Sequence, residues 1–400
     1  MNPRLDALQP YPFERLRALL NGVSIASLPA IRLSVGEPQH PTPAFIRDAL
    51  TAHLDGLSSY PLTTGSDRLR GAIAQWFRQR FGLASLDAAA QVLPVNGTRE
   101  ALFALAQCII DGKEDPLVVC PNPFYQIYEG AALLAGAGTA FLNQTPANRF
   151  GLDLDALTKE EWSRVQLMYV CSPGNPAGSV LSIDDWKRLF EYADRFGFVI
   201  ASDECYSEIY FDESTPPVGG LQAAQALGRS DYRNLIAFTS LSKRSNVPGM
   251  RSGAVAGDAR LLAQFLRYRT YHGSAMSPSF QEASIAAWQD EAHVRENRRL
   301  YLEKFTALVP RLSPVMGVEW PEAGFYLWAS VPDRWGNDDE AFTRDLIAAT
   351  NVAVLPGSYL ARTAHGENPG KGRVRIALVA TLDECVEAAQ RIRSYVESVA

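Results

Sequence analysis

Three apolar runs, each followed at once by polar residues, decide the fold: LMYVCSPGNPAGSVLS at 167–182, FVIASDECYSEIYF at 198–211 and LIAFTSLSKRSNVPGMRSG at 235–253. Each apolar part has the length of a strand and is continuous, which is typical of strands buried on both faces of a sheet. Similar runs stand at 92–95, 117–120 and 253–256. Helical patterns lie between several of them, such as Trp186, Leu189, Phe190 and Ala193. Strand–helix alternation predicts an α/β fold with a mostly parallel sheet.

The pattern of the chain changes after about residue 290. A charged helical stretch at 291–309 precedes strand-like runs at 317–320 and 324–329, a helix near 339–350, further strand-like runs at 352–355 and 373–379, and a closing helix from Asp383. This order predicts a smaller α+β domain. Because 400 residues exceed the usual size of one core, we expect three parts. They are an N-terminal segment at 1–40 that packs on the small domain, a large domain at 41–290 and a small C-terminal domain at 291–400.

The composition excludes several classes of protein. A net charge of −6 argues against nucleic acid and membrane surfaces as partners, because both attract basic chains. No run approaches the roughly 18 apolar residues of a membrane span, and the N-terminus has no signal-peptide pattern, so we expect a cytoplasmic protein. The five cysteines are scattered without CxxC spacing and predict reduced thiols. The five histidines show no metal-binding spacing, so we expect no metal site.

Polar residues cluster just past the carboxyl ends of the predicted strands, where ligands bind in open α/β sheets. Taken singly these signals are weak, because an Asn-Gly pair usually marks a turn and an Asp after a strand often caps a helix. Their succession along one chain is far more specific. The segments are Asn96-Gly97-Thr98-Arg99, Pro121–Tyr125, Ser172–Pro176, Ser202–Tyr206 and Ser240-Leu241-Ser242-Lys243, followed by Arg251.

This succession resembles the fold-type I enzymes that depend on pyridoxal-5′-phosphate (PLP), and within them the class I/II aminotransferases. The resemblance covers essentially the whole chain, and its most specific segments are SPGNPAGSVLS (172–182), SDECYSEIYF (202–211) and SLSKRSNVPGMRSG (240–253). It implies the fold of a PLP-dependent transferase, with a large PLP-binding domain around a mostly parallel sheet and a smaller α+β domain. It also implies an enzyme that transfers amino groups between amino acids and 2-oxo acids.

The resemblance gives a role to each residue around the cofactor ring. It implies that Lys243 supplies the amine that condenses with the cofactor aldehyde and, once released, moves the α-proton of the substrate. Asp203 would pair with the protonated pyridine nitrogen, which keeps the ring able to accept electrons. Asn175 and Tyr206 would hydrogen-bond the ring hydroxyl oxygen, and Tyr125 would stack on the ring.

The same resemblance implies a phosphate site at the start of a helix. Gly97 and Thr98 would offer free N–H groups there, with Arg99 contributing only its amide. Ser240 and Arg251 would add a hydroxyl group and a forked cation. Tyr60 resembles the tyrosine that reaches the cofactor phosphate of the neighbouring subunit, which implies a homodimer with shared active sites.

Two segments resemble the substrate side of these enzymes. The Gly36 amide, within Ser34–Pro38, would face the substrate carboxylate, and Asn175 would also contact the substrate. Arg375 occupies the position of the arginine that clamps the α-carboxylate, although by context alone it could be a surface strand arginine. Arg269 is our candidate for a cation in the distal pocket, contributed by this subunit or its partner. The alternative for Arg269 is a solvated helix arginine beside Arg267.

The stretches 34–50 and 268–305 resemble the N-succinyldiaminopimelate aminotransferases of lysine biosynthesis. That implies transfer between glutamate and N-succinyl-2-amino-6-oxopimelate. An aspartate-type aminotransferase of other specificity and a PLP-dependent C–S β-lyase stay open, because the cofactor motifs do not separate them. A PLP-sensing regulator would need an N-terminal DNA-binding domain, for which Ser34–Pro38 begins too early. A nicotinamide dehydrogenase would need a GxGxxG motif near the first strands, and none is present.

Overall fold

The computed structural model describes residues 1–112 and 115–399, and its largest element is a seven-stranded sheet. The strand order is β2-β8-β7-β6-β5-β3-β4. β8 is antiparallel to both of its neighbours and every other pair is parallel, so the carboxyl ends of the remaining strands meet at one edge. The strands are β2 (Val92–Val95), β3 (Leu117–Asn122), β4 (Gly138–Asn143), β5 (Val165–Cys171), β6 (Val199–Asp203), β7 (Leu235–Ser240) and β8 (Gly253–Gly257).

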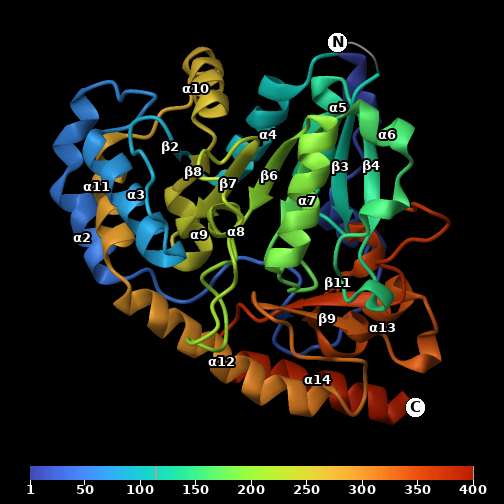
Figure 1. Cartoon of the computed structure of the whole chain (residues 1–400). Coiled ribbons are helices and arrows are strands. Elements are labelled where there is room, and N and C mark those ends of the chain that lie inside the picture. Colours follow the sequence, from blue (N-terminus) through green and yellow to red (C-terminus); the bar gives the residue numbers. More distant parts are fainter. Residues whose placement is uncertain (113–114, 400) are drawn as a thin grey trace.

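Helices cover both faces of this sheet (Figure 1). Along β5, Met168 and Val170 belong to one apolar core, whereas Leu167 and Tyr169 belong to another on the opposite face. Both faces of the strand are therefore buried, which explains its continuous apolar sequence. The first core includes α2 (Ala44–Ala52), α3 (Asp67–Phe81), α6 (Lys159–Arg164), α7 (Ile183–Phe196), α8 (Gly220–Ala226) and α11 (Pro278–Gln289). The second includes α4 (Thr98–Ile109), α5 (Ile127–Ala135) and α10 (Ala259–His272).

Local sequence signals set the ends of these helices. α7 begins with a capping box, in which Ser182 Oγ accepts from the Asp185 amide and the Asp185 carboxylate accepts from the Ser182 amide. It ends at Gly197, whose φ of 81° is left-handed and suits a residue without a side chain. α3 is bounded in the same way, by Ser66 at its start and Gly82 at its end.

A second, antiparallel sheet of order β11-β12-β9 lies beyond the carboxyl-terminal edge of the first. It contains β9 (Tyr326–Ser330), β11 (Leu355–Pro356) and β12 (Arg373–Ala377). α12 (Ala292–Leu312), α13 (Asp339–Thr350) and α14 (Leu382–Val399) share its apolar core. The N-terminal part joins this unit, because β1 (Ile31–Arg32) pairs with β10 (Val352–Ala353) and α1 (Pro12–Leu19) packs on Trp328. We propose the three-part division at 1–40, 41–290 and 291–400 on this basis.

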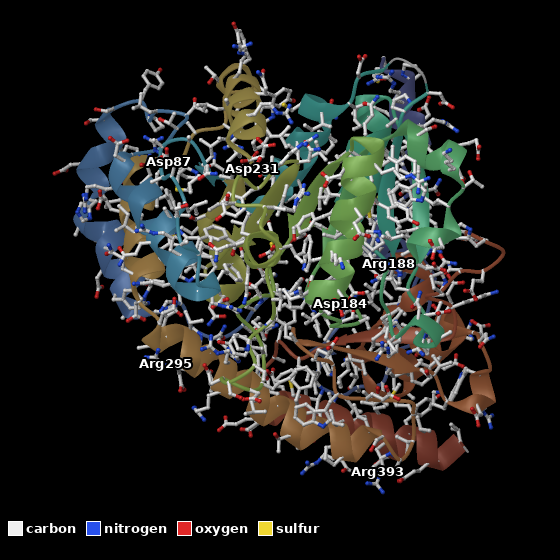
Figure 2. The ribbon with its side chains drawn as sticks, viewed as in Figure 1. Asp87, Asp184, Arg188, Asp231, Arg295 and Arg393 are labelled. Carbon is white, nitrogen blue, oxygen red and sulfur yellow. The ribbon has the colours of Figure 1, made fainter. Side chains whose placement is uncertain are left out.

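α12 follows the lower edge of the molecule and lies beside α14 (Figure 1). Its outer face is charged: Arg295 points away from the body of the molecule, as Arg393 does on α14 (Figure 2). Its inner face carries Asn297, Tyr301 and Lys304, all of which are almost completely buried. The helix therefore turns polar side chains toward the interior of the molecule.

The prediction of a mostly parallel α/β sheet is confirmed, and each of its six predicted strands coincides with an observed one. Two details differ. The run at 317–320 forms no strand, and only Gly317 makes a single bridge to Ser330. β4 was not predicted, because its sequence GTAFLN contains a glycine and only three strongly apolar or β-branched side chains at an edge position. Among the described residues, no helix is both long and apolar enough to cross a membrane.

Candidate active site

A cavity of about 470 Å³ lies at the edge where the parallel strands end, and residues of the smaller sheet close its other side. β6 and β7 end at Asp203 and Ser240 beside it, and α9 (Leu241–Arg244) follows directly. Most of the predicted site residues line this cavity. They are Gly36, Thr98, Arg99, Tyr125, Asn175, Asp203, Tyr206, Ser240, Lys243, Arg251 and Arg375.

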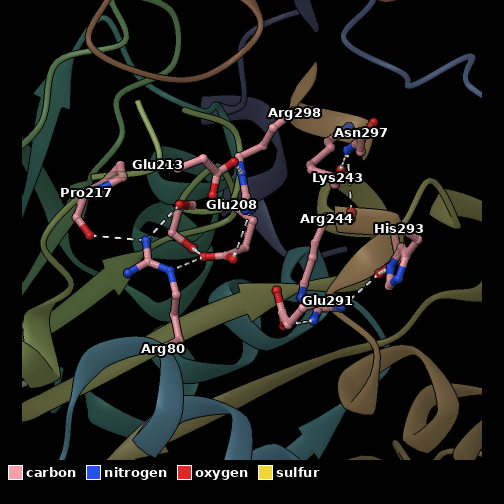
Figure 3. A network of polar contacts seen from close by, with 12 residues as sticks. Arg80, Glu208, Glu213, Pro217, Lys243, Arg244, Glu291, His293, Asn297 and Arg298 are labelled. Carbon is pink, nitrogen blue, oxygen red and sulfur yellow. Dashed lines mark hydrogen bonds and ion pairs between the residues drawn. The ribbon is translucent and has the colours of Figure 1, made fainter. Parts of the chain in front are cut away.

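The amine of Lys243 points into the cavity from the short helix α9. Its Nζ donates to the Gly36 carbonyl oxygen over 2.5 Å, and burial lowers the pKa of Lys243 to about 8. The main chain of α9 is fixed from behind by the next residue, Arg244, which forms an ion pair with Glu291 (Figure 3). Lys243 is thus an amine that loses its proton more readily than an exposed lysine, and it stands next to a residue that an ion pair holds in place.

Asp203 is the buried acid of the cavity. Tyr128 Oη donates to its Oδ2 over 2.6 Å, and the Cys205 amide donates to its Oδ1 over 3.2 Å. Burial raises the pKa of the Asp203 carboxyl, while these hydrogen bonds and the charge of Lys243 oppose the rise. A cation or an N–H group within the cavity would stabilise the charged form further.

One end of the cavity is suited to an anion. Gly97, which has a φ of 81° and no side chain, is the N-cap of α4, so it leaves the first amides of this helix without a side-chain cap. A Cβ atom built on Gly97 would overlap the guanidinium group of Arg251, which therefore lies directly against this backbone. Ser240 adds a hydroxyl group, which accepts from the Ser242 amide over 3.1 Å. Thr98 contacts Cys205 Sγ through its own hydroxyl, over 3.0 Å.

The opposite end holds a second, buried guanidinium group. Arg375 Nη1 donates to Asn175 Oδ1 over 3.0 Å, and Nη2 donates to the Ser34 carbonyl oxygen over 2.9 Å. The Tyr206 and Tyr326 hydroxyl groups lie 3.0 Å apart beside it, and Arg375 lies over the Tyr326 ring. The surface-arginine alternative does not fit this residue, because only 5 % of Arg375 is exposed.

Two predicted residues lie elsewhere. Arg269 does not line the cavity, because it is buried in an ion pair with Glu100, with Nη1–Oε distances of 2.7 and 2.9 Å. Neither the distal-pocket prediction nor the solvated alternative fits a side chain that is 1 % exposed, so we withdraw Arg269 as a substrate contact. Tyr60 is fully exposed and lines a separate hollow, so within this subunit it reaches no cofactor site.

Sequence reasoning missed several residues of the cavity. Tyr128, which holds Asp203, and Tyr326, which contacts Tyr206, follow no strand end in the sequence. Tyr11 reaches the cavity from the N-terminal segment, whose short length gave no sign of its position. The side chain of Arg99 also lines the cavity, although we expected only its amide there.

Comparisons with known proteins bear on this geometry. The sequence profile of the family described as Aminotransferase class I and II matches residues 29–392. The chain belongs to this family. The LL-diaminopimelate aminotransferase of Maridesulfovibrio salexigens is 31% identical over 393 residues, which are 97% of each chain. A solved aminotransferase from Neisseria meningitidis is 53% identical, with a TM-score of 0.95 over 99% of this chain and 100% of that one. A probable N-succinyldiaminopimelate aminotransferase from Thermus thermophilus is 26% identical, with a TM-score of 0.83 over 96% and 99% of the two chains.

Class I and II aminotransferases depend on PLP and act on amino-acid and 2-oxo-acid substrates, so the protein is a PLP-dependent transaminase. The residues of the cavity fit this cofactor. Lys243 offers a buried amine for an aldehyde, and Asp203 offers a buried carboxylate for a ring N–H group. The free amides beside Gly97, together with Arg251 and Ser240, form a cradle for a phosphate group. In residues 1–112 and 115–399, no cluster of three His, Cys, Asp or Glu side chains could hold a metal ion.

We expect Gly97→Ala to weaken PLP binding at least about tenfold, because other residues avoid the φ of 81° and ψ of 152° found here and the neighbouring amides would move out of place. The added methyl group would also displace Arg251. Fluorescence titration of the cofactor-free protein with PLP measures the effect. Gly71→Ala is the matched control, since Gly71 lies within α3 with open space around it and should bind PLP like the wild type. If the Gly97 variant bound PLP as tightly as the wild type, the proposed phosphate site beside Gly97 would be wrong.

Proposed function

We propose that this aminotransferase holds PLP with Lys243 at the aldehyde, Asp203 at the ring nitrogen, and Ser240 and Arg251 at the phosphate. The single observation that carries the proposal is that a buried amine of low pKa and a buried carboxylate line the same cavity. Tyr125 is the ring-stacking residue in this proposal. Asn175 and Tyr206 are the hydrogen-bond partners of the ring hydroxyl oxygen, and Gly97, Thr98 and Arg99 supply amides.

When bound, PLP supplies an aldehyde for the amino group and a ring that accepts electrons. In our proposal Arg375 binds the α-carboxylate of the substrate with two parallel hydrogen bonds, in place of its present contact with the Ser34 carbonyl oxygen. Once the substrate amino group has replaced it at the aldehyde, the Lys243 amine, whose pKa burial lowers to about 8, would take the α-proton and return it to a neighbouring carbon atom. The negative charge of Asp203 keeps a proton on the ring nitrogen throughout.

We further propose a substrate with a second carboxylate, of the diaminopimelate type, with glutamate and 2-oxoglutarate as the other pair. The name of the Maridesulfovibrio relative supports the free LL-diaminopimelate, and that of the Thermus structure supports the N-succinyl form that we expected. Both carry a carboxylate far from the reacting carbon. An aspartate-type aminotransferase and a C–S β-lyase remain the alternatives, and release of pyruvate and ammonia from cystathionine would favour the lyase.

Arg99 replaces Arg269 as our candidate for the distal cation. It lines the cavity beside Tyr11 and Tyr125, and its Nε donates to Tyr125 Oη over 2.7 Å. Among the hydrogen bonds of the described residues, none uses its two terminal nitrogens. Burial raises the pKa of Tyr125, so this hydroxyl stays protonated and orients the guanidinium group as a neutral acceptor.

We also propose a homodimer in which Tyr60 reaches the partner's cofactor phosphate. The proposal is supported by the complete exposure of Tyr60 and by the exposed apolar residues around it, Leu57 and Leu62. A partner subunit would remove these apolar side chains from water.

A half-reaction tests the function. Purified enzyme loaded with PLP is mixed with glutamate, LL-diaminopimelate, the N-succinyl derivative of diaminopimelate or alanine, and the conversion of the cofactor to its amine form is followed by absorbance. We expect at least one diaminopimelate substrate and glutamate to convert the cofactor much faster than alanine does. Rapid conversion by alanine alone would contradict the proposed substrate class but not the transaminase activity.

For Arg99→Ala we expect a rise of about tenfold or more in KM for glutamate and diaminopimelate, since a lost hydrogen bond to a charged group costs about 1.5–3 kcal/mol. The kcat/KM for alanine should change less than about twofold, because alanine lacks the second carboxylate. Arg188→Ala is the control, since Arg188 is exposed on α7 and forms an ion pair with Asp155 at the surface (Figure 2). An equal loss with all three substrates would reject Arg99 as the distal cation.

A further inference from the structure

The inner face of α12 carries a set of buried polar side chains outside the cavity. Asn297, Tyr301 and Lys304 are spaced i, i+4 and i+7, so they lie on one face of the helix. Between them stands His40, four residues after the cavity-lining Gly36, with its ring 4.6 Å from that of Tyr301. We call His40, Asn297 and Lys304 the α12 triad.

Hydrogen bonds connect the α12 triad to two parts of the active site, and the main chain from His40 connects it to a third, Gly36. Lys304 Nζ donates to His40 Nε2 over 2.7 Å and to the Leu378 carbonyl oxygen over 3.2 Å, just beyond the strand that carries Arg375. His40 Nδ1 lies 2.8 Å from Asn297 Oδ1. Asn297 Nδ2 donates to the Lys243 carbonyl oxygen over 3.1 Å, as Figure 3 shows.

The direction of every hydrogen bond in the triad follows from Lys304. An ammonium group can only donate, so His40 Nε2 must be the acceptor and Nδ1 must carry the proton. Asn297 therefore accepts at Oδ1, where it also receives Asn246 Nδ2 over 3.1 Å, and donates from Nδ2. Only a neutral imidazole satisfies this arrangement, because a second proton on His40 would face the Lys304 ammonium.

We propose that His40 is a positioning residue for transamination, which holds the Gly36 segment, the Lys243 main chain and the end of the Arg375 strand in one fixed arrangement. The proposal rests on the role of Lys243 proposed above. Gly36 is the point of contact, because its carbonyl oxygen accepts from Lys243 Nζ. If His40 released its segment, the Lys243 amine would be less well oriented for proton transfer, whereas Arg375 would keep its hydrogen bond to Asn175 Oδ1.

The charges around His40 agree with this arrangement. Burial and the charge of Lys304 lower the pKa of His40, while the hydrogen bond to Asn297 and the exposed Glu296 oppose the change. Around Lys304, burial lowers the pKa to about 8, and Glu384 and Cys385 of α14 are the nearby groups that oppose it. The arrangement with a charged Lys304 therefore holds from about pH 6.5 to about pH 8, and it is lost as the pH falls through the lowered pKa of His40.

His40→Leu and His40→Gln test the proposal. Leucine removes both polar atoms, whereas glutamine keeps one acceptor and one donor at a similar separation and does not titrate. In PLP-loaded protein at pH 8, we expect leucine to speed hydrogen exchange in residues 31–40 and to lower kcat about ten- to a hundredfold, with KM changed less than about twofold. The glutamine variant should show nearly wild-type hydrogen exchange and kcat. It should also lack the fall in kcat that protonation of His40 causes at low pH.

His272→Leu is the control, since His272 is exposed at the end of α10, where its ring stacks on that of Tyr268. If His40→Leu does not fold, Lys304→Met is a second variant that interrupts the α12 triad. It should produce the same increase in hydrogen exchange in residues 31–40. Unchanged exchange and kcat in the leucine variant would overturn the proposal, and so would a glutamine variant as impaired as leucine. The exchange measurement needs no turnover, so it separates failure of this inference from failure of the Lys243 assignment.

Discussion

Lys243→Ala should lower kcat by at least about a thousandfold, because the variant loses the amine that holds the cofactor and moves the α-proton. The cavity of the Lys243→Ala variant still contains Asp203, Ser240 and Arg251, so the variant should bind PLP without a covalent bond. Steady-state transamination and single-turnover absorbance, measured with glutamate, would separate the loss of proton transfer from the loss of cofactor. Before glutamate is added, the absorbance spectrum of the PLP-loaded variant should be that of PLP with a free aldehyde.

Lys187→Ala serves as the control, since Lys187 is an exposed residue of α7. The most informative comparison is Lys304, because burial lowers its pKa to about 8, as it does for Lys243. Low pKa alone therefore does not distinguish the two lysines, and the position in the cavity does. If Lys243→Ala still completed many turnovers at a rate near wild type, the proposed mechanism would be wrong.

Asp203→Asn is expected to have the second largest effect, a loss of about a thousandfold in kcat, comparable to the removal of a key electrostatic contact in other enzymes. The amide oxygen can still accept from the Cys205 amide and the NH2 group can donate to Tyr128 Oη, so the fold should tolerate the change. The amide cannot hold a proton on the ring nitrogen, and the ring then accepts electrons poorly. The measurement is the rate of α-proton exchange of glutamate in deuterated buffer, together with kcat.

Glu204→Gln is a matched control for Asp203→Asn. Glu204 is the next residue, is equally buried and accepts from Ser202 Oγ and the Gly220 amide, but it does not line the cavity. Burial raises the pKa of Glu204 to about 7, so a neutral amide resembles one of its ordinary states. We expect proton exchange to stay near wild type in this variant. Similar losses in both variants would point to a structural role for Asp203.

The sequence predicted those parts of the molecule that depend on local signals. Continuous apolar runs identified the buried strands, and the polar residues behind them, Asp203, Ser240 and Lys243, lie at the strand ends where they were expected. The geometry of parallel strands explains this success, since their carboxyl ends share one edge of the sheet. β8 is the exception in direction, and nothing in its short sequence distinguishes an antiparallel strand.

Long-range partners could not be predicted in the same way. We expected Arg269 in the substrate pocket, but its side chain is neutralised by Glu100, which lies 169 residues earlier. No local pattern in the sequence indicates this ion pair. Tyr128 and Tyr326 reach the cavity through the packing of α5 and β9, and each would pass for a core aromatic in the sequence. The contacts of His40 span more than 250 residues and were equally invisible.

The position of the cofactor bond is the most direct test of the account. The chain contains six lysines, Lys113, Lys159, Lys187, Lys243, Lys304 and Lys371. PLP-loaded protein would be reduced with borohydride, digested and analysed by peptide mass spectrometry. We predict that the reduced cofactor is attached to Lys243 alone. Attachment to Lys304 or to any other lysine, with Lys243 unmodified, would contradict the proposed active site.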